Sequence, residues 1–266
     1  MISKASRSSL VSVVCAIFSV LPTANALAKS NGDSDVPTDE ILAQCSQNSQ
    51  STQSSCVRDT LSRFINRNLK TVSYSEARHI VFSKIDTYHG QDGHNTVDSV
   101  YSTDSVDMDQ NANANMPRNS EGKSFNIEHT WPQSYLKQYN RFDQARADMF
   151  HLFPVEEHIN SERGNLPFRD CNDNSQNSTQ RVSNTCDGGF EPPAQHRGKV
   201  ARAMFYMAVT YNMKIDATQE QILRKWNEEF PVTDSERERD SRIHEVEGVH
   251  NPFILHPEWV SRISDF

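Results

Sequence analysis

The sequence predicts an α+β fold, a mostly helical single domain in which short strands lie between two helical regions. Apolar residues recur at helical spacing in residues 57–86 and again in residues 200–230. Short runs between these regions, such as residues 124–129, have the composition of strands. A chain of 266 residues can bury one good core, or at a stretch two small ones, so one domain is the simpler interpretation.

The N-terminus has the pattern of a secretory signal peptide. Lys4 and Arg7 precede an apolar run at residues 10–21, and small residues follow it. This pattern predicts a signal peptide at residues 1–26, although cleavage after residue 28 fits the same rule. Because the run is only about a dozen residues, too short to cross a bilayer as a helix, we expect an exported protein, secreted or periplasmic, without a membrane anchor.

Four of the five cysteines would remain after export, because Cys15 lies inside the predicted signal peptide. An even set in an exported chain predicts two disulfides. Sequence proximity favours Cys45 with Cys56 and Cys171 with Cys186, although four cysteines allow three pairings. A zinc site is the alternative, but the closely spaced C-x-x-C pairs that it would want are absent.

Residues 27–56 are rich in Ser, Asn, Gln and Asp, and we expect them to form a polar leader ahead of the main domain at residues 57–266. At the start of that domain, residues 57–86 predict two amphipathic helices. Ser73 or Ser75 is placed to cap the second helix.

The next stretch holds two patterns that resemble cation sites. His89 and His94 flank a glycine-rich turn, and exposed histidines in a turn explain them better than a metal site does. From Asp107, polar residues alternate as in the front of a calcium loop, but alanine stands where the turn glycine belongs and no glutamate closes the loop. We therefore expect a polar surface loop there, preceded by a short strand within residues 97–106.

The segment after this loop predicts the order strand, loop, helix. Residues 124–129 read as a strand, which Trp131 and Pro132 end. Residues 155–163 read as a short helix, with Gly164 as its C-terminal cap.

The C-terminal part predicts helices after a long polar insertion at residues 170–189. Apolar stripes at residues 200–211 and 222–230 are typical of core helices. Residues 235–247 alternate in charge sign at helical spacing, which is typical of a solvated helix face.

Three short segments, residues 126–132, 148–154 and 160–168, contain the residues that best support chemistry. Glu128 and Asn160 would offer a hard divalent cation one carboxylate and one amide oxygen, with positions left for water and phosphate. Such a sparse site suits Mg²⁺, and Mn²⁺ or Ca²⁺ could substitute in it. A structural salt bridge and exposed polar decoration remain open as ordinary explanations of the same two residues.

His129 is the candidate general base, because an unperturbed imidazole with a pKa of about 6.5 is largely neutral near pH 7 and still accepts a proton. Arg163 follows Asn160 by three residues, so that on a helix both side chains share a face. Arg163 could therefore grip a phosphate. A surface ion pair with Glu156 or Glu157 is the competing explanation.

These segments resemble the endonuclease I family, which includes periplasmic and extracellular bacterial nucleases of the ββα-metal, or His-Me finger, type. The likeness runs from about residue 74 through residue 259. In that family a Glu-His pair at a strand end supplies a metal ligand and the general base, and an asparagine on the following helix completes the metal site. The resemblance implies these roles for Glu128, His129 and Asn160, and it implies a fold built around a ββα-metal motif.

The chain departs from the family pattern at two places. Where many relatives read Asp-Leu-His-His-Leu, this chain keeps Asp148 and His151 and lacks the first histidine, which puts a supporting contact in doubt. We interpret Asp148 and His151 as supporting groups behind the core triad. Some relatives carry a glutamate where this chain has Arg146, so leaving-group protonation is expected to fall to water on the metal.

The resemblance implies in-line attack by a water that His129 deprotonates, products with 5′ phosphates, and little sequence preference. The formal charge is -8, and loss of Lys4 and Arg7 with the signal peptide would leave 25 basic against 35 acidic residues, about -10. This net negative charge argues against overall electrostatic attraction to nucleic acid. A nuclease with this charge needs a local positive surface and a metal ion to bind the phosphate. We expect a monomer that acts on DNA, RNA or both.

Two other classes of protein are alternatives to a nuclease. An exported binding protein with a degenerate nuclease fold would have no physical reason to keep Glu128, His129 and Asn160 together. A zinc peptidase would want an H-E-x-x-H helix, which the sequence lacks. Metal-dependent turnover separates the nuclease from the binding protein.

Overall fold

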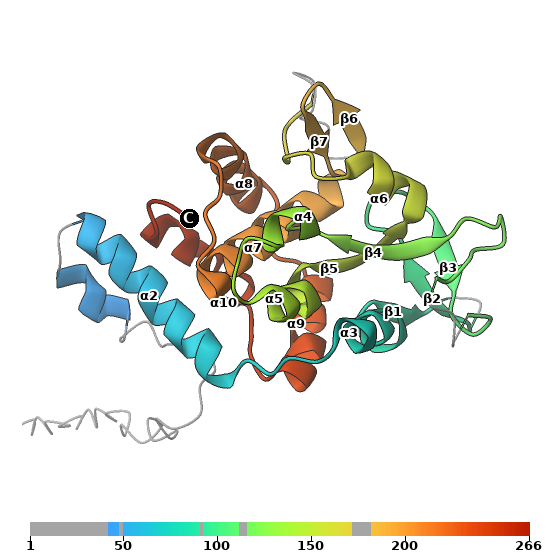
Figure 1. Cartoon of the computed structure of the whole chain (residues 1–266), viewed down its shortest axis with the longest axis horizontal. Helices are drawn as coiled ribbons and strands as arrows, with labels where there is room; N and C mark the ends of the chain where they lie inside the picture. The colour runs from blue at the N-terminus through green and yellow to red at the C-terminus, as the bar shows by residue number, and fades with distance from the viewer. Residues whose placement is uncertain (1–41, 48–49, 91–92, 112–115, 172–181) are drawn as a thin grey trace, which may run out of the picture. The chain divides into compact units, whose positions relative to one another are not determined.

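The computed structural model describes residues 42–47, 50–90, 93–111, 116–171 and 182–266 (Figure 1). The predicted signal peptide lies outside the described residues, so the structure does not test it. The described helices are η1 (Gln44–Gln47), α2 (Gln50–Asn68), α3 (Tyr74–Ile80), η2 (Val81–Ile85), α4 (Gln133–Leu136), α5 (Phe142–Ala147), η3 (Met149–His151), α6 (Glu157–Arg163), α7 (Ala194–Tyr211), α8 (Ala217–Glu229), α9 (Asp234–Glu247), α10 (Pro252–Leu255) and η4 (Pro257–Arg262).

Short antiparallel strands form three small sheets, so the predicted α+β class is confirmed. The strands are β1 (Thr87–His89), β2 (Asn95–Asp98) and β3 (Ser105–Asp107) in one sheet, β4 (Phe125–His129) with β5 (Leu152–Glu156) in the second, and β6 (Asn184–Cys186) with β7 (Gly189–Glu191) in the third. In the second sheet Glu128 lies opposite Phe153 and His129 opposite Leu152. The helix α6 follows β5 directly.

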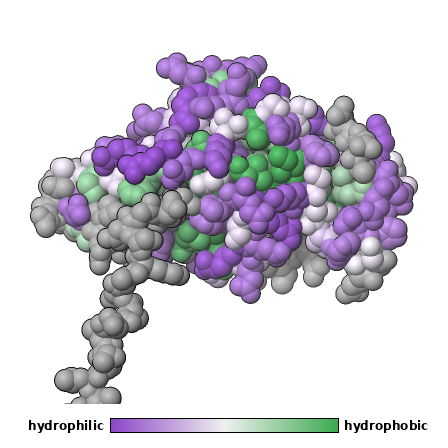
Figure 2. Space-filling model, turned by 90° about the horizontal axis from the view of Figure 1, so that it is seen from below, coloured by the Kyte–Doolittle hydropathy of each residue, from purple (hydrophilic) through white to green (hydrophobic). Residues whose placement is uncertain are grey.

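The core is built around α7, which lies between α2, α8 and η3 (Figure 1). Almost every residue of α7 is buried, as the apolar stripe at residues 200–211 predicted. Gly198 marks the closest approach to α8, because a Cβ there would lie 2.4 Å from the carbonyl oxygen of Phe230. The absence of a side chain at this position therefore lets the two helices pack. Hydrophilic residues dominate the face shown in Figure 2, with a hydrophobic area near its middle.

Two predicted elements differ in the structure. The strand expected within residues 97–106 is a hairpin, in which Val97 pairs with Val106 and the residues between form a turn. Ser99 and Ser102 in that turn both hydrogen-bond the buried carboxylate of Glu156, and these bonds stabilise the reversal. The helix expected at residues 155–163 begins two residues later, because Val155 and Glu156 belong to β5 and α6 starts at Glu157.

The predicted helix cap and disulfides are confirmed, and one expected boundary differs. Ser73, and not Ser75, caps α3 by accepting a hydrogen bond from the amide of Glu76. Both favoured disulfides, Cys45 with Cys56 and Cys171 with Cys186, are present. The helix α2 starts at Gln50 and so crosses the boundary expected between leader and domain. Among the residues described, no helix combines the length and apolar character needed to span a membrane.

Candidate active site

The end of β4 and the face of α6 form one side of an open cavity of about 440 Å³. Glu128 and His129 reach it from the strand, and Asn160 and Arg163 reach it from the helix. The antiparallel pairing puts Glu156, at the end of β5, opposite Phe125 at the start of β4. The helix α6 then runs back along β4, so that Asn160 bonds the carbonyl of Ile127 and Arg163 bonds that of His129. The structure therefore brings four of the six predicted site residues to one cavity.

His129 is held as a neutral imidazole with a defined tautomer. Its Nε2 lies 3.1 Å from the carbonyl oxygen of Arg146, and since a carbonyl only accepts, Nε2 carries the proton. Nδ1 is then the acceptor, and it receives a hydrogen bond from the Gln133 amide at 3.2 Å. Burial, with the nearby His151 second, lowers the pKa of His129 well below its usual value. The lone pair available for a proton is therefore on Nδ1.

Asn160 turns its amide nitrogen to the strand. Its Nδ2 donates to the carbonyl oxygen of Ile127 at 2.9 Å and to Oδ1 of Asn126 at 2.8 Å. Because the Ile127 carbonyl accepts only, the orientation of the Asn160 amide is fixed. Its Oδ1 receives no hydrogen bond from the described residues and lines the cavity. Asn160 thus offers an oriented oxygen in a helix where asparagine has poor propensity.

Glu128 is 1% exposed and is held through one of its two oxygens. The hydroxyl of Tyr101 donates to Oε1 at 2.7 Å, and Nη1 of Arg163 lies 3.4 Å from the same atom. Burial raises the pKa of Glu128, whereas Arg163 and the Tyr101 hydrogen bond lower it. Oε2 has no donor among the described residues, so this oxygen remains open.

Arg163 lines the cavity as its spacing from Asn160 predicted, but it is buried and not on the surface. Its guanidinium donates to the carbonyl oxygens of His129, Thr130 and Gly164 at 3.2, 2.9 and 3.3 Å. Its ion-pair partner is Glu128, so the alternative of a surface pair with Glu156 or Glu157 is wrong. The guanidinium also lies over the ring of Phe168, with 4.6 Å between Cζ and the ring centroid.

The two predicted supporting residues occupy different places. The ring of His151 packs edge-on against that of His129 at 5.3 Å, and its Nε2 lies 2.7 Å from the carbonyl oxygen of Ala145. Burial lowers the pKa of His151 to about 3, so it is neutral near pH 7. Asp148 instead accepts hydrogen bonds from the hydroxyl of Tyr211 and the amide of Phe150, and thereby connects η3 with α7.

The sequence analysis did not identify four residues that contact the candidate site residues. Tyr101 binds Glu128, Gln133 binds His129, Asn126 binds Asn160, and the ring of Tyr74 lies 5.2 Å from that of His129. Asn126 lies within the segments that were singled out and Gln133 lies directly after them, so their proximity in sequence was a usable signal. No local pattern links Tyr101 to Glu128, because the contact spans 27 residues.

The residues present fit a hard divalent cation. Glu128 Oε2 and Asn160 Oδ1 are oxygen acceptors without a protein donor among the described residues, and both side chains line the same open cavity. Few protein ligands beside open positions are typical of Mg²⁺ sites that act on phosphates.

A second group of possible ligands is His94, Asp107 and Asp109, whose ligand atoms lie within 4.8 Å of one another. Both carboxylates are engaged by the chain itself. Asp109 accepts from the backbone and side chain of Asn95, and Asp107 accepts from the Asp109 amide and from Gln110. This arrangement agrees with the polar loop expected there.

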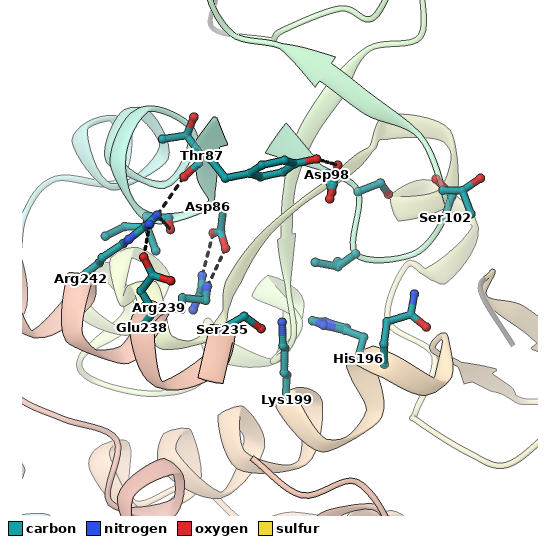
Figure 3. A pocket seen from close by; sticks show the side chains of 16 residues that line it. Asp86, Thr87, Asp98, Ser102, His196, Lys199, Ser235, Glu238, Arg239 and Arg242 are labelled. Atoms are coloured by element: carbon teal, nitrogen blue, oxygen red, sulfur yellow. Dashed lines mark hydrogen bonds and ion pairs between the residues drawn. The ribbon is translucent and has the colours of Figure 1, made fainter. Parts of the chain in front are cut away.

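Among three cavities formed by the described residues, the largest, of about 830 Å³, lies between β1, the β2–β3 hairpin, α7 and α9 (Figure 3). Most of its charges are paired: Arg239 with Asp86 at 2.8 Å, and Arg242 with Glu238 at 2.5 Å. Lys199 projects toward it from α7, and burial lowers the pKa of this lysine. The Arg239–Asp86 pair joins α9 to the residue after η2, and the Arg242–Glu238 pair lies within α9.

Comparison with known proteins finds similarity to nucleases. Residues 53–258 match the family model described as Endonuclease I. An extracellular ribonuclease of Bacillus subtilis is 34% identical over 159 residues, which cover 52% of this chain and 54% of that protein. An extracellular deoxyribonuclease of Aeromonas hydrophila is 32% identical over 118 residues, 43% of this chain and 51% of that protein. The chain thus spans about half the length of the curated relatives it matches.

Proposed function

This chain belongs to the endonuclease I family, and we propose that it is an exported, magnesium-dependent endonuclease that hydrolyses phosphodiester bonds with little sequence preference. The observation that carries the proposal is that one cavity is lined by His129, whose imidazole is neutral, and by Glu128 and Asn160, each of which has an open oxygen. A base for water and ligands for a cation are the two requirements for metal-assisted phosphodiester hydrolysis. We further propose that β4, β5 and α6 form the ββα-metal motif of this family.

Glu128 and Asn160 would hold Mg²⁺, with Mn²⁺ or Ca²⁺ as possible substitutes, and a bound cation would neutralise the charge that develops on the phosphate. His129 accepts the proton of the attacking water at Nδ1, where the water replaces the amide of Gln133. The carbonyl of Arg146 then stabilises the imidazolium, because it already accepts the Nε2 hydrogen. The expected products carry 5′ phosphates.

We assign Arg163 a positioning role in place of the phosphate grip expected from its spacing. Its guanidinium holds the last carbonyls of β4 and the carboxylate of Glu128, and it is 1% exposed. Asp148 and His151 support the site from behind, His151 through the ring of His129 and Asp148 through η3.

The substrate class remains DNA, RNA or both, since curated relatives are named as ribonucleases and as deoxyribonucleases. We propose a secreted or periplasmic location, which the two disulfides and the extracellular and periplasmic relatives support. The protein is proposed to act as a monomer, with a signal peptide at residues 1–26.

The test is cleavage of plasmid DNA and of RNA by the purified protein with Mg²⁺ and then with EDTA. We expect cleavage that EDTA abolishes. Glu128→Ala and Asn160→Ala should weaken calorimetric metal binding and lower the rate, whereas Glu157→Ala, on the exposed side of α6, should do neither. Cleavage that survives EDTA, or full activity in Asn160→Ala, would overturn the assignment. No cleavage of either substrate would favour a binding protein with a degenerate site.

A further inference from the structure

A second cavity adjoins the proposed catalytic cavity and shares Pro132, Arg163 and Asn165 with it. It encloses about 430 Å³, within the roughly 300–1,000 Å³ typical of small-molecule sites. Its walls come from the chain between β4 and α4, from the loop after α6, and from the start of α8. We call it the aromatic cavity, after the rings of Trp131, Tyr135 and Tyr139 that line it.

The aromatic cavity contains an unsatisfied donor. The indole of Trp131 is 5% exposed, and its Nε1 has no hydrogen-bond partner among the residues that the structure describes. A buried N–H without an acceptor is costly, so such a group in a cavity wall indicates a ligand that brings an acceptor. Tyr135, in contrast, is 45% exposed and presents its ring at the cavity, with its hydroxyl 3.4 Å from the carbonyl oxygen of Asn165.

Two exposed cations lie at the rim of this cavity. Arg169 and Lys214, which are far apart in the sequence, both line the cavity, and both are exposed. The single carboxylate in the lining, Asp216, is occupied in capping α8, where it accepts from the amides of Thr218 and Gln219. Lys214 lies 3.4 Å from Asp265, whereas Arg169 has no ion pair among the described residues. Arg169 is therefore the cation available to a phosphate next to a base in this cavity.

We propose that the aromatic cavity binds one nucleobase of an unpaired strand, next to the phosphate that the catalytic cavity cleaves. The inference rests on the proposed nuclease function and adds a base subsite to it. Aromatic side chains stack on any base, and the Trp131 N–H can donate to a ring nitrogen or carbonyl oxygen of that base. The shared residues place the base and the scissile phosphate in neighbouring cavities, as consecutive parts of one strand require.

A base must leave the helical stack to enter such a cavity. Extraction from a duplex costs free energy that a single strand does not have to supply. The aromatic cavity therefore favours single-stranded substrate, and it does so without preference among the bases, because every base has a face on which a ring can stack.

The test compares two single-stranded oligonucleotides of equal length and charge, one with bases and one abasic along its whole length. We expect the wild-type protein with Mg²⁺ to cleave the strand with bases about 10- to 100-fold faster in kcat/KM, the range that one stacked base supplies. Tyr135→Ala should bring the two rates together, and Trp131→Phe, which keeps the ring and removes the N–H, should reduce the preference several-fold. Tyr88→Ala is the matched control, since this tyrosine is 44% exposed and lines the largest cavity instead.

The outcomes separate the two proposals. Equal rates on the two strands with the wild-type protein would overturn the base subsite and leave the nuclease function intact. An undiminished preference in both Tyr135→Ala and Trp131→Phe, with melting temperatures that show folded proteins, would also overturn it. Failure to cleave either strand while plasmid DNA is cleaved with Mg²⁺ would also overturn the base subsite. Failure to cleave the oligonucleotides, plasmid DNA and RNA alike would instead reject the proposed nuclease function on which the subsite rests.

Discussion

The catalytic cavity at β4 and the largest cavity at α9 differ in how their polar atoms are used. The largest cavity has more charged residues, but Arg239 and Arg242 are bound to carboxylates or to backbone carbonyls (Figure 3). The catalytic cavity has fewer charges, yet Glu128 and Asn160 each use one end of the side chain to hold a position and leave the other end open. The number of charged groups is thus a poor guide to chemistry, and open lone pairs beside oriented neighbours are a better one.

The comparison predicts that a change at the catalytic cavity alters rate and leaves the fold in place. His129→Ala should lower the single-turnover cleavage rate by about 10²- to 10⁴-fold, the usual contribution of a general base. Metal affinity, measured by calorimetric titration, should be retained, and imidazole in the buffer should partly restore the rate. Loss of metal binding in His129→Ala would show that this residue is a ligand and not the base.

A change at the largest cavity should have the opposite effect. Asp86→Ala leaves the guanidinium of Arg239 without its carboxylate partner, and we expect a loss of about 2–3 kcal/mol in the free energy of unfolding. Denaturant unfolding measures this loss, and Asp98→Ala, whose partner Tyr88 is exposed, should cost less. Nuclease activity of the folded Asp86 variant should stay near wild type; a loss comparable to that of His129→Ala would place the largest cavity in the catalytic machinery.

Removal of a hydrogen bond that orients a proposed metal ligand should have a smaller effect. Tyr101→Phe removes the hydrogen bond to Oε1 of Glu128 and keeps the ring that packs against Phe190. We expect about tenfold weaker metal binding, as is usual when a group that orients a ligand is removed. Calorimetric titration with Mn²⁺ measures the change. Unaltered affinity would mean that Arg163 alone orients the carboxylate.

The last effect is confined to acidic conditions and concerns stability as a function of pH. Since the pKa of His151 is about 3 in the folded protein and about 6.5 in an unfolded chain, the unfolded state binds the extra proton as pH falls through 6.5. His151 therefore lowers stability progressively from about pH 6.5 toward pH 3 and has a constant effect above 6.5. His151→Gln, which keeps a donor for the Ala145 carbonyl, should reduce that slope by up to about 1.4 kcal/mol per pH unit. Identical slopes in denaturant melts at pH 4 to 6 would contradict the assignment.

Much of the fold followed from local pattern. The stripe at residues 200–211 became the buried helix α7, and Gly164 ends α6 with a positive φ of 53°. The hairpin at residues 97–106 was missed because its turn contains no glycine or proline, and its reversal depends on contacts with Glu156, far along the chain.

The sequence predicted four residues that line one cavity, Glu128, His129, Asn160 and Arg163, but it did not predict the partners that hold them. The spacing of Asn160 and Arg163 placed both on one face of a helix, and they do share a cavity. That Arg163 would be buried could not follow from spacing, because its burial depends on how α6 meets β4 and Phe168. Local pattern thus predicts which side chains share a face, and only tertiary packing decides which of their atoms remain free.

The double attachment of Asn160 limits what selection can place at this position. Aspartate is nominally the stronger ligand for a hard cation, but it has no hydrogen to give to the carbonyl of Ile127, and its second oxygen would face that carbonyl and Oδ1 of Asn126. Asn160→Asp would therefore improve the ligand atom but weaken the attachment of α6 to β4, the strand that contains the proposed base His129. Substitution of Asn160 is therefore disfavoured in two ways. Some replacements would be weaker metal ligands, and aspartate would lose the hydrogen bonds that attach residue 160 to β4.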